Sequence, residues 1–512
     1  MNQSKQNEAK YKRYWIIGIV IAILVAALLI WNSGIFVKNA AAATVGDRSY
    51  SVAEMEYYYH TVANSTINTA KQYQSYGVDM GYNPDLPPEE QMYNEEEGKT
   101  YKDYFMDSAL EQMQRNTILC DQAAKESYTL SSKGQKAVEQ NLSYLETYSL
   151  QSGTSKSTYL KMVYGRYMTQ DLFERLITDS ILAEEYAQHK TEQFDYTDKE
   201  LEAYYDKNAD SLDSYEYRSC YINYKAEDKT DAEGKPIEPS EEEVAAAMKD
   251  ASKEADSMIA EIKSGTDFNK AAVKYVDEQS AESYKDPEYN HQKDTLGSAI
   301  DPTIADWMME KGRITGDITA IEVPNTGYCV VQFLDRDKAE DSYQTANYRN
   351  ILVLAETTKS EQGPAVPTED QLAAAKVQAE ALLDEWKSGD ATADSFAALA
   401  SEKSADDLTK EDGGMNEKAN RDAMTPDTAA WLFDADRKKG DAAVVEHQDE
   451  TGAVTGYDVL YMESFGEIRW KFQAASNLGS ADYDKWYEKQ EGSYPAAVTD
   501  QVKHIPTISI TG

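Results

Sequence analysis

The side chains that most often carry catalysis are scarce in this chain and are not grouped along it. Its 512 residues include five histidines and three cysteines, namely His60, His189, His291, His447, His504, Cys120, Cys220 and Cys329. No spacing among them and the serines predicts a nucleophile beside its base. The chain contains no G-x-x-x-x-G-K-[ST] loop, no C-x-x-C pair and no H-E-x-x-H helix, which disfavours nucleotide, zinc and metalloprotease sites. We therefore expect no cofactor and no bound metal.

A repeated signature is more informative than any single residue. P-x-x-A-x-W followed by G-D occurs twice, about 124 positions apart, at Pro302, Ala305, Trp307 and Gly316-Asp317, and at Pro426, Ala429, Trp431 and Gly440-Asp441. Each copy closes on T-G-Y and an apolar run, at Thr326-Gly327-Tyr328 and at Thr455-Gly456-Tyr457. Because shared order and near-equal spacing rarely arise by chance, we infer a duplicated domain of about 120 residues.

The elements that must position these residues also recur. A strand-like run, Tyr217 to Lys225 in the first copy and Tyr348 to Ala355 in the second, precedes a long helix with a capping box at its start. The boxes are Ser240-x-x-Glu243 and Thr368-x-x-Gln371. We assign the copies to residues 215–337 and 346–465 and predict a small antiparallel sheet with helices in each, an α+β fold.

Much of the chain outside the two copies is predicted to be helical. In residues 43–206 apolar and aromatic side chains recur at helical spacing, with Ser51 as an N-cap candidate and Thr197-x-x-Glu200 as a capping box. A polar, proline-containing stretch from Asn83 to Glu97 is predicted to be a loop. Residues 466–512 have an amphipathic aromatic pattern, which predicts a helical tail that packs on the N-terminal helices.

Tyrosine is unusually frequent, with 37 copies, and this frequency allows two interpretations. Clusters such as Tyr57-Tyr58-Tyr59, and Tyr73 with Tyr76, could offer contact area to another polypeptide, because a phenol tolerates both water and apolar partners. The same tyrosines could instead fill the interfaces between helices.

An apolar run near the start predicts a membrane anchor. Residues 14–37 are long and apolar enough to cross a bilayer. Residues 1–13 form a short basic tail, so the positive-inside rule predicts a cytoplasmic N-terminus and an extracytoplasmic chain beyond the anchor. The alternative is a cleaved signal peptide, because Ala41-Ala42-Ala43 offers an A-x-A site. A formal net charge of −40 argues against a nucleic-acid partner.

The order of these features resembles the parvulin-type peptidyl-prolyl isomerases, and more narrowly the exported PrsA-like and SurA-like foldases. In those foldases a helical chaperone region precedes such domains. The residues that carry the resemblance are Thr44 to Ser51, Thr197 to Tyr217, Asn350-Ile351-Leu352-Val353 against the family's H-I-L-V strand, Phe396, Ala400 and Ser404 of an F-x-x-x-A-x-x-x-S helix, and Gly413-Gly414. The resemblance covers most of the chain and implies that unfolded or emerging secreted polypeptides are its partners.

The resemblance fails at the positions that the family uses for activity. Active parvulins carry two histidines on adjacent central strands. At the matching positions this chain has Tyr221 and Cys329 in the first copy, and Asn350 and Asp458 in the second. None of its five histidines is predicted at a strand position that would replace them. We expect Asn350 and Asp458 to face each other across neighbouring strands as a hydrogen-bonded structural pair.

Prolyl isomerisation requires no nucleophile and no cofactor. Rotation about an X-Pro bond has a barrier of about 18–20 kcal/mol and breaks no bond, so a catalyst needs an apolar pocket for the ring and polar groups near the amide. In the family that pocket carries an aromatic residue where the two copies have Pro302 and Pro426. Trp307, Met308 and Trp431 are candidate substrate-binding residues, and core packing is the alternative role for them.

These observations predict a membrane-anchored extracytoplasmic foldase or chaperone with weak or absent prolyl isomerase activity. One alternative is an active isomerase with an altered site. Another is a non-catalytic scaffold for assembly of the cell envelope. The sequence makes no prediction of oligomeric state.

Overall fold

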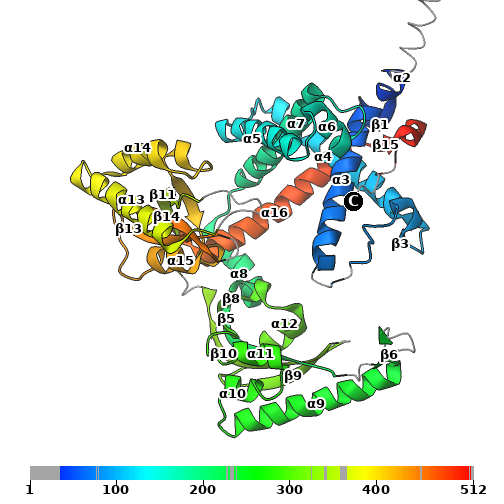
Figure 1. The fold of residues 1–512 in the computed structure, drawn as a ribbon. Helices are drawn as coiled ribbons and strands as arrows, with labels where there is room; N and C mark the ends of the chain where they lie inside the picture. The colour runs from blue at the N-terminus through cyan, green and yellow to red at the C-terminus, as the bar shows by residue number, and fades with distance from the viewer. Residues whose placement is uncertain are drawn as a thin grey trace, which may run out of the picture. The chain divides into compact units, whose positions relative to one another are not determined.

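The computed structural model describes residues 35–506 and residue 508, apart from positions 76–77, 79, 226–228, 231–235, 238, 325, 340–342, 358–365 and 450–451. The chain divides into two compact units, whose helices and strands are labelled in Figure 1. The described residues up to Asp195 and from Gly479 onward form the first unit, and Tyr196–Leu478 forms the second. Helices alternate with small antiparallel sheets, which confirms the α+β class.

The first unit is mostly helical. Its elements up to the unit boundary are α2 (Ile35–Lys38), β1 (Ala41–Val45), β2 (Arg48–Ser51), α3 (Val52–Ser75), η1 (Pro88–Glu90), β3 (Met92–Asn94), β4 (Lys99–Thr100), α4 (Tyr101–Lys125), α5 (Ser132–Gln151), α6 (Lys156–Tyr164) and α7 (Gln170–Glu192). Ser51 caps α3 as predicted, since its N–H donates to the Glu54 carboxylate at 2.7 Å and its Oγ accepts from the Glu54 N–H at 3.3 Å. Met55, Tyr59, Phe105 and Met113 are fully buried in the core that these helices share.

The stretch between Asn83 and Glu97 is only partly a loop. Its proline-rich half forms the single turn η1, and β3 then pairs antiparallel with β4, with Met92 opposite Thr100. The loop prediction is therefore wrong for Met92–Asn94. Met92–Asn94 becomes a strand because it pairs with Lys99–Thr100 in a short hairpin. The composition of the segment does not predict this pairing.

The end of the chain completes the first unit. Helix α16 (Arg469–Glu491) contributes its residues from Gly479 onward, and β15 (Ala496–Val498) and η6 (Asp500–His504) follow. Trp486 packs against Tyr186 of α7, with ring centroids 6.3 Å apart. Strand β15 pairs antiparallel with β1, so the sheet order is β15-β1-β2. Residues from the two ends of the chain thus share one sheet.

The predicted membrane anchor lies almost entirely outside the described residues, which begin at residue 35. Residues 35–37 of the predicted segment fall in the four-residue helix α2. Within the described ranges, no helix combines the length and the apolar character that crossing a bilayer requires.

The second unit begins with α8 (Asp198–Leu212), whose N-cap Thr197 and Glu200 form the predicted capping box. A buried carboxylate joins this helix to the sheet that follows it. Asp213 is 2% exposed and accepts hydrogen bonds from the Tyr205 hydroxyl at 2.7 Å, from Arg336 Nε at 2.8 Å and from the Ala339 N–H at 2.8 Å. These three hydrogen bonds to one carboxylate connect the segment before the first repeat to the segment at its end.

The two repeats have the same architecture. The first consists of β5 (Ser214–Asn223), β6 (Lys229–Thr230), β7 (Pro236–Ile237), α9 (Glu241–Lys263), α10 (Phe268–Ala272), α11 (Glu278–Ser283), β8 (His291–Leu296), η2 (Gly297–Ala299), α12 (Pro302–Met308), β9 (Ile318–Val323) and β10 (Gly327–Asp337). The second consists of β11 (Gln344–Leu354), α13 (Glu369–Ser388), α14 (Ala393–Lys403), η4 (Lys410–Asp412), β12 (Met415–Ala419), η5 (Arg421–Ala423), α15 (Pro426–Leu432), β13 (Ala442–Gln448) and β14 (Val454–Ile468). Their sheet orders, β8-β5-β10-β9 and β12-β11-β14-β13, correspond strand for strand. Both predicted capping boxes, on α9 and α13, are present.

The tryptophan of the repeated signature has the same contacts in both copies. The guanidinium of Arg313 lies 3.9 Å from the ring centroid of Trp307, and its Nε donates to the Trp307 carbonyl at 3.1 Å. Arg437 lies 3.9 Å from the Trp431 ring and donates to the Trp431 carbonyl at 2.7 Å. The arginine follows the tryptophan by six positions each time. A cation–π stack that closes the helix end therefore explains this landmark.

The G-D pair of the signature is a turn that bonds to the last long strand. Gly316 and Gly440 have φ of 93° and 91°, a backbone region that side chains with a Cβ rarely adopt. Their N–H groups donate to the carbonyls of Phe333 and Met462, each at 2.9 Å. The carbonyls of Asp317 and Asp441 in turn accept hydrogen bonds from the N–H groups of Phe333 and Met462. The G-D pair of the signature therefore marks the turn that is hydrogen-bonded to β10 in the first repeat and to β14 in the second.

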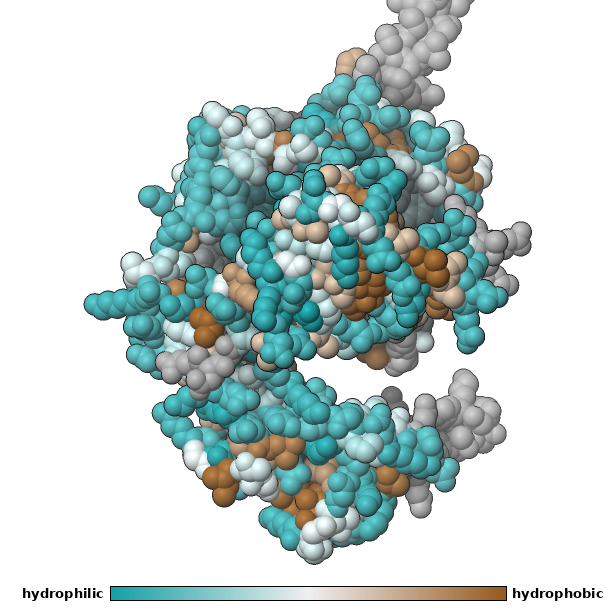
Figure 2. Space-filling model, turned by 90° about the vertical axis from the view of Figure 1, so that its left-hand side faces the viewer, coloured by the Kyte–Doolittle hydropathy of each residue, from teal (hydrophilic) through white to brown (hydrophobic). Residues whose placement is uncertain are grey.

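The tyrosine clusters are divided between the core and the surface. Tyr57, Tyr58 and Tyr59 are 6%, 4% and 0% exposed, so they fill the interfaces between helices and offer no contact area. Tyr73 is 44% exposed, and Tyr76 lies outside the described residues. The face in Figure 2 is covered mainly by hydrophilic residues, and its apolar residues form separate small patches. This distribution is consistent with the net charge of −40.

Candidate functional site

The second repeat brings together Asn350 and Asp458, the two candidate site residues that the sequence suggested there. Asn350 lies on β11 and Asp458 on β14, the two central strands of the sheet. Asn350 Nδ2 donates to Asp458 Oδ1 at 3.2 Å. Asp458 is only 6% exposed, so this hydrogen bond forms where water is largely excluded.

Asn350 is the centre of a larger polar network. Its Nδ2 also lies 3.4 Å from Asp406 Oδ2, and its Oδ1 accepts from Thr409 Oγ1 and from Asn416 Nδ2, each at 3.1 Å. Thr409 Oγ1 further donates to Asp406 Oδ2 at 2.6 Å. Both ends of the amide are therefore occupied, which fixes its orientation. Asp406 and Thr409 come from the segment that joins α14 to β12, and Asn416 lies on β12 itself. The sequence did not point to any of the three.

A histidine completes this network from a different strand. His447 lies on β13, directly opposite Gly456 of the T-G-Y motif, and its Nδ1 is 2.8 Å from Asp458 Oδ2. The hydrogen bond to Asp458 raises the pKa of His447 above its ordinary value, although partial burial acts in the opposite direction. His447 occupies neither of the two matching strand positions, which Asn350 and Asp458 hold, and it reaches Asp458 from the neighbouring strand β13. Aligning the strands on either side of the turn before T-G-Y would have found it.

A glycine lets the connecting segment approach the strand that carries Asn350. Gly414 has a φ of 73°, and its carbonyl accepts from the Asn350 N–H at 2.9 Å. A Cβ at this position would lie 2.2 Å from the Asn350 carbonyl oxygen, which is far inside van der Waals contact. Only glycine fits here, which explains the G-G pair noted in the sequence.

An apolar cluster lies beside the polar network. Tyr348 is two residues before Asn350 on β11, so the two side chains point to the same face. Burial, with smaller contributions from Asp458 and Asp406, raises the pKa of the Tyr348 phenol to about 12. Tyr348 packs with the buried Ala346, Leu432 and Met462, and with Met424, Trp431 and Phe433. The second repeat therefore places polar groups beside an apolar cluster on one face of the sheet.

The first repeat places its matching residues differently. Tyr221 and Cys329 are direct cross-strand partners on β5 and β10. The Tyr221 hydroxyl donates to Asp301 Oδ2 at 2.8 Å, and Asp301 is the N-cap of α12. Cys329 is fully buried, and burial raises the pKa of its thiol to about 12, so it stays protonated near neutral pH. His291, also on a strand, lies at the sheet edge with its Nε2 2.5 Å from Glu216. Among the described residues, no polar cluster comparable to that of Asn350 forms around Tyr221.

The candidate substrate-binding residues are mostly packed into the repeats. Met308 is 1% exposed and lies in the core with Phe333, so its side chain is not open to a client. Trp307 and Trp431 are half-buried under their arginines. Of the three, Trp431 alone borders the apolar cluster next to Asn350. In the ranges that the structure describes, no three His, Cys, Asp or Glu side chains are arranged to bind a metal ion.

A comparison with known families matches most of the second repeat. Residues 353–463 match the rotamase family model, described as the PPIC-type PPIase domain. The matched range contains Asp406, His447 and Asp458. No curated protein matches the chain.

Solved structures of foldases are similar in part. PrsA of Bacillus anthracis is 21% identical, with 30% of this chain and 60% of that chain covered and a TM-score of 0.18. PrsA of Bacillus cereus is 15% identical, with 66% and 88% covered and a TM-score of 0.20. A SurA-like chaperone structure from Campylobacter jejuni is 16% identical, with 43% and 78% covered and a TM-score of 0.16. The chain thus spans less than two thirds of the Bacillus anthracis protein.

The family model covers only one repeat, and the equal strand order relates the other repeat to it by topology. Residues 353–463 form a domain of the PPIC-type peptidyl-prolyl isomerases, the parvulin family.

Proposed function

We propose that this chain is a membrane-anchored, extracytoplasmic foldase that binds unfolded or emerging secreted polypeptides and has weak or absent prolyl isomerase activity. Residues 14–37 would anchor it, and residues 43–206 would form the chaperone-like domain. Residues 215–337 and 346–465 would act as peptide-binding or spacer modules, and residues 466–512 would form a tail on the N-terminal helices. The observation that carries the proposal is a parvulin fold present twice with neither histidine pair.

The contacts within the repeats support weak catalysis. In the first, the Tyr221 hydroxyl is bonded to Asp301 and the Cys329 thiol is closed off by burial. In the second, Asn350 has all of its amide atoms bonded within the protein, so it has few groups left for a substrate amide. Holding an unfolded segment needs only accessible apolar surface. The helical unit has such surface, for example Tyr144, Tyr148, Leu150 and Met162 on α5 and α6, which are 49–72% exposed.

The proposal is tested by an aggregation assay with the full chain in lipid nanodiscs. A chemically denatured client is diluted into buffer, and light scattering is recorded with and without an equimolar amount of the chain. We expect a longer lag before aggregation and capture of the unfolded client on the nanodisc. An unchanged lag, together with no binding of the unfolded client, would show that the chain is not a foldase.

One observation favours a second candidate function, an active prolyl isomerase with an altered site in the second repeat. His447 Nδ1 lies 2.8 Å from Asp458 Oδ2, beside an apolar cluster that could hold a proline ring. A cationic imidazole near the amide would stabilise the twisted transition state electrostatically. This arrangement uses a strand that the family's histidine pair does not use.

Magnetisation-exchange measurements on an X-Pro peptide separate the two functions. Under the foldase proposal, we expect the chain to accelerate exchange by less than about tenfold, or about 1.4 kcal/mol of barrier. An active altered site would give a larger acceleration, which His447→Ala should reduce by about 100-fold. Tyr221→Phe is the matched control in the first repeat and should change nothing. If the chain catalysed exchange strongly and Tyr221→Phe abolished that catalysis, both the weakly active foldase and the altered site in the second repeat would be contradicted.

A further inference from the structure

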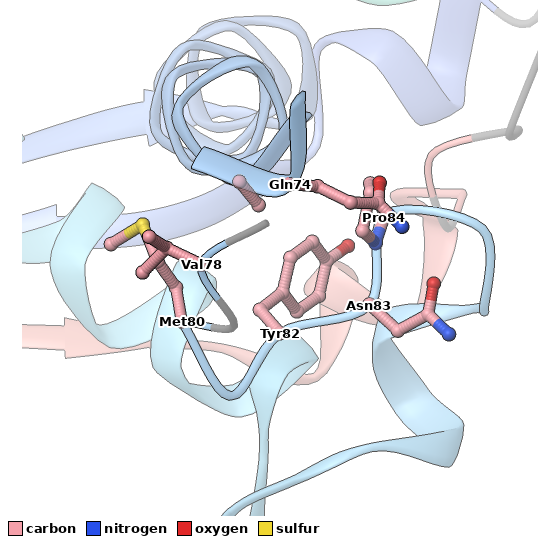
Figure 3. A pocket seen from close by; sticks show the side chains of 7 residues that line it. Gln74, Val78, Met80, Tyr82, Asn83 and Pro84 are labelled. Carbon is pink, nitrogen blue, oxygen red and sulfur yellow. The ribbon is translucent and has the colours of Figure 1, made fainter. Parts of the chain in front are cut away.

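The helical unit contains a hollow that the parvulin assignment leaves unexplained. It lies between the end of α3 and the segment that follows, with a volume of about 310 Å³. Its labelled lining residues in Figure 3 are Gln74, Val78, Met80, Tyr82, Asn83 and Pro84. We call it the acidic-loop pocket. Its volume is at the lower end for ligand sites and suits one or two side chains better than a cofactor.

The base of the acidic-loop pocket is rigid and its wall is adaptable. Tyr82 is 4% exposed, and its ring centroid lies 4.6 Å from that of Tyr101 and 5.8 Å from that of Phe105. Val78 and Met80 are 48% and 49% exposed and lie together on one side in Figure 3. A flexible thioether adapts to different apolar partners. The pocket can therefore accept apolar side chains of more than one shape.

Further apolar side chains are exposed on the segment that continues from the pocket lining. Leu86, Met92 and Tyr93 are 45%, 44% and 50% exposed. Tyr93 is held in place by stacking on Tyr104, with centroids 4.2 Å apart and planes 17° apart. Several large apolar side chains that stay exposed next to a hollow mark an interaction surface.

The segment that continues from the lining of the acidic-loop pocket carries charge of one sign. Residues 83–97 contain six carboxylates and no lysine or arginine, and all six are exposed: Asp85, Glu89, Glu90, Glu95, Glu96 and Glu97. Lys99, which follows them, already binds Asp107 at 2.9 Å and Glu97 at 3.5 Å. This field attracts cations and repels phosphates, anionic lipid headgroups and a second copy of a chain with a charge of −40.

We propose that the acidic-loop pocket binds an apolar side chain of an unfolded polypeptide whose neighbouring residues are lysine or arginine. The inference rests on the proposed foldase function and specifies which client segments it prefers. The apolar side chain would enter between Met80 and Tyr82, and the flanking cations would face the six carboxylates. Because those carboxylates are exposed, the attraction acts mainly through long-range charge and weakens in salt.

The test compares two labelled peptides in binding to the full chain in nanodiscs, measured by fluorescence anisotropy. One peptide alternates leucine and lysine between glycine–serine flanks, and the other has glutamate in place of each lysine. We expect the basic peptide to bind at least about tenfold more tightly at low salt and to lose most of that preference at high salt. Equal binding of both peptides would overturn the inference.

Two variants locate the binding. Asp85→Asn, Glu89→Gln, Glu90→Gln and Glu95→Gln together should weaken basic-peptide binding by about tenfold. The matched control removes as many exposed carboxylates elsewhere, by Glu380→Gln, Asp384→Asn, Glu385→Gln and Asp390→Asn, and should leave binding unchanged. Val78→Ser with Met80→Ser should weaken binding of the basic peptide at both salt concentrations. These side chains are exposed, so a loss of folding is not expected and circular dichroism checks it.

The outcomes separate this inference from the foldase proposal. If the chain delays client aggregation but the loop variant binds the basic peptide as tightly as the parent, the pocket assignment is wrong and the foldase proposal stands. If the chain neither delays aggregation nor binds either peptide, both are wrong. Self-association in ultracentrifugation that Val78→Ser with Met80→Ser removes would show that the pocket binds a second copy, which also overturns the inference.

Discussion

Phe396→Ala is expected to destabilise the second repeat by about 3–5 kcal/mol while the first repeat stays folded. Phe396 is fully buried on α14, and its ring centroid lies 5.7 Å from that of Trp386 and 5.2 Å from that of Tyr461. Truncation leaves a cavity between a helix and the sheet and removes both aromatic contacts. Hydrogen exchange read by mass spectrometry should show lost protection in α13, α14, β11 and β14.

Two further variants make this result interpretable. Leu408→Ala, at a side chain that is 64% exposed in the same repeat, should change stability by less than about 0.5 kcal/mol. Phe268→Ala removes the corresponding phenylalanine of the first repeat, which is 4% exposed and packs with Ala251 and Met258. This substitution should reduce hydrogen-exchange protection in α9, α10, β5 and β10 of the first repeat instead. Loss of protection in both repeats from either substitution would mean that the repeats fold as one cooperative unit.

The pair of substitutions also tests the functional proposal. If the repeats serve as spacers, losing the fold of one should leave unfolded-client binding by the helical unit largely intact. If the second repeat is an isomerase, Phe396→Ala should abolish catalysis and Phe268→Ala should not. The two matched phenylalanines therefore separate a supporting role from a catalytic one without touching Asn350, Asp458 or His447.

The landmarks of the repeats could be predicted because their causes are local. Trp431 and Arg437 are six positions apart, and the G-D turn bonds to a strand whose start is marked by T-G-Y. Such short-range requirements leave the same residues at the same spacing in both copies. The pairing of Asn350 with Asp458 followed from strand alternation, because both positions were assigned to adjacent central strands.

The remainder of the site depends on contacts that spacing does not encode. Asp406 and Thr409 lie in an irregular segment whose course is set by the close approach of Gly414 to β11. His447 reaches Asp458 only through the register of the β13–β14 pairing. Register shifts along β11 further displace positions that simple alternation would align. Tertiary pairing thus decides which polar groups meet, and the sequence pattern alone did not include His447.

Acidification is expected to destabilise the helical unit through His60. Burial lowers the pKa of this histidine from 6.5 to about 4, and a hydrogen bond with the Val163 backbone opposes the shift only in part. The unfolded chain therefore takes up a proton between pH 6.5 and 4 that the folded unit does not bind. The stabilising contribution is complete above pH 6.5 and is lost as the pH falls towards 4, by about 3 kcal/mol in total. Urea unfolding followed by circular dichroism at pH 7 and pH 4.5 measures this loss.

The substitution His60→Gln isolates this contribution from other groups that titrate nearby. Glu56 is fully buried one turn earlier on α3, and burial raises the pKa of its carboxyl, so its own protonation favours the folded state as the pH falls. Because Glu56 remains in the variant, the difference between parent and variant reports on His60. The variant should lose less stability between pH 7 and pH 4.5 than the parent does. If the parent and His60→Gln lost equal stability, the ring of His60 would have to remain accessible to protons in the folded unit, which contradicts its 8% exposure.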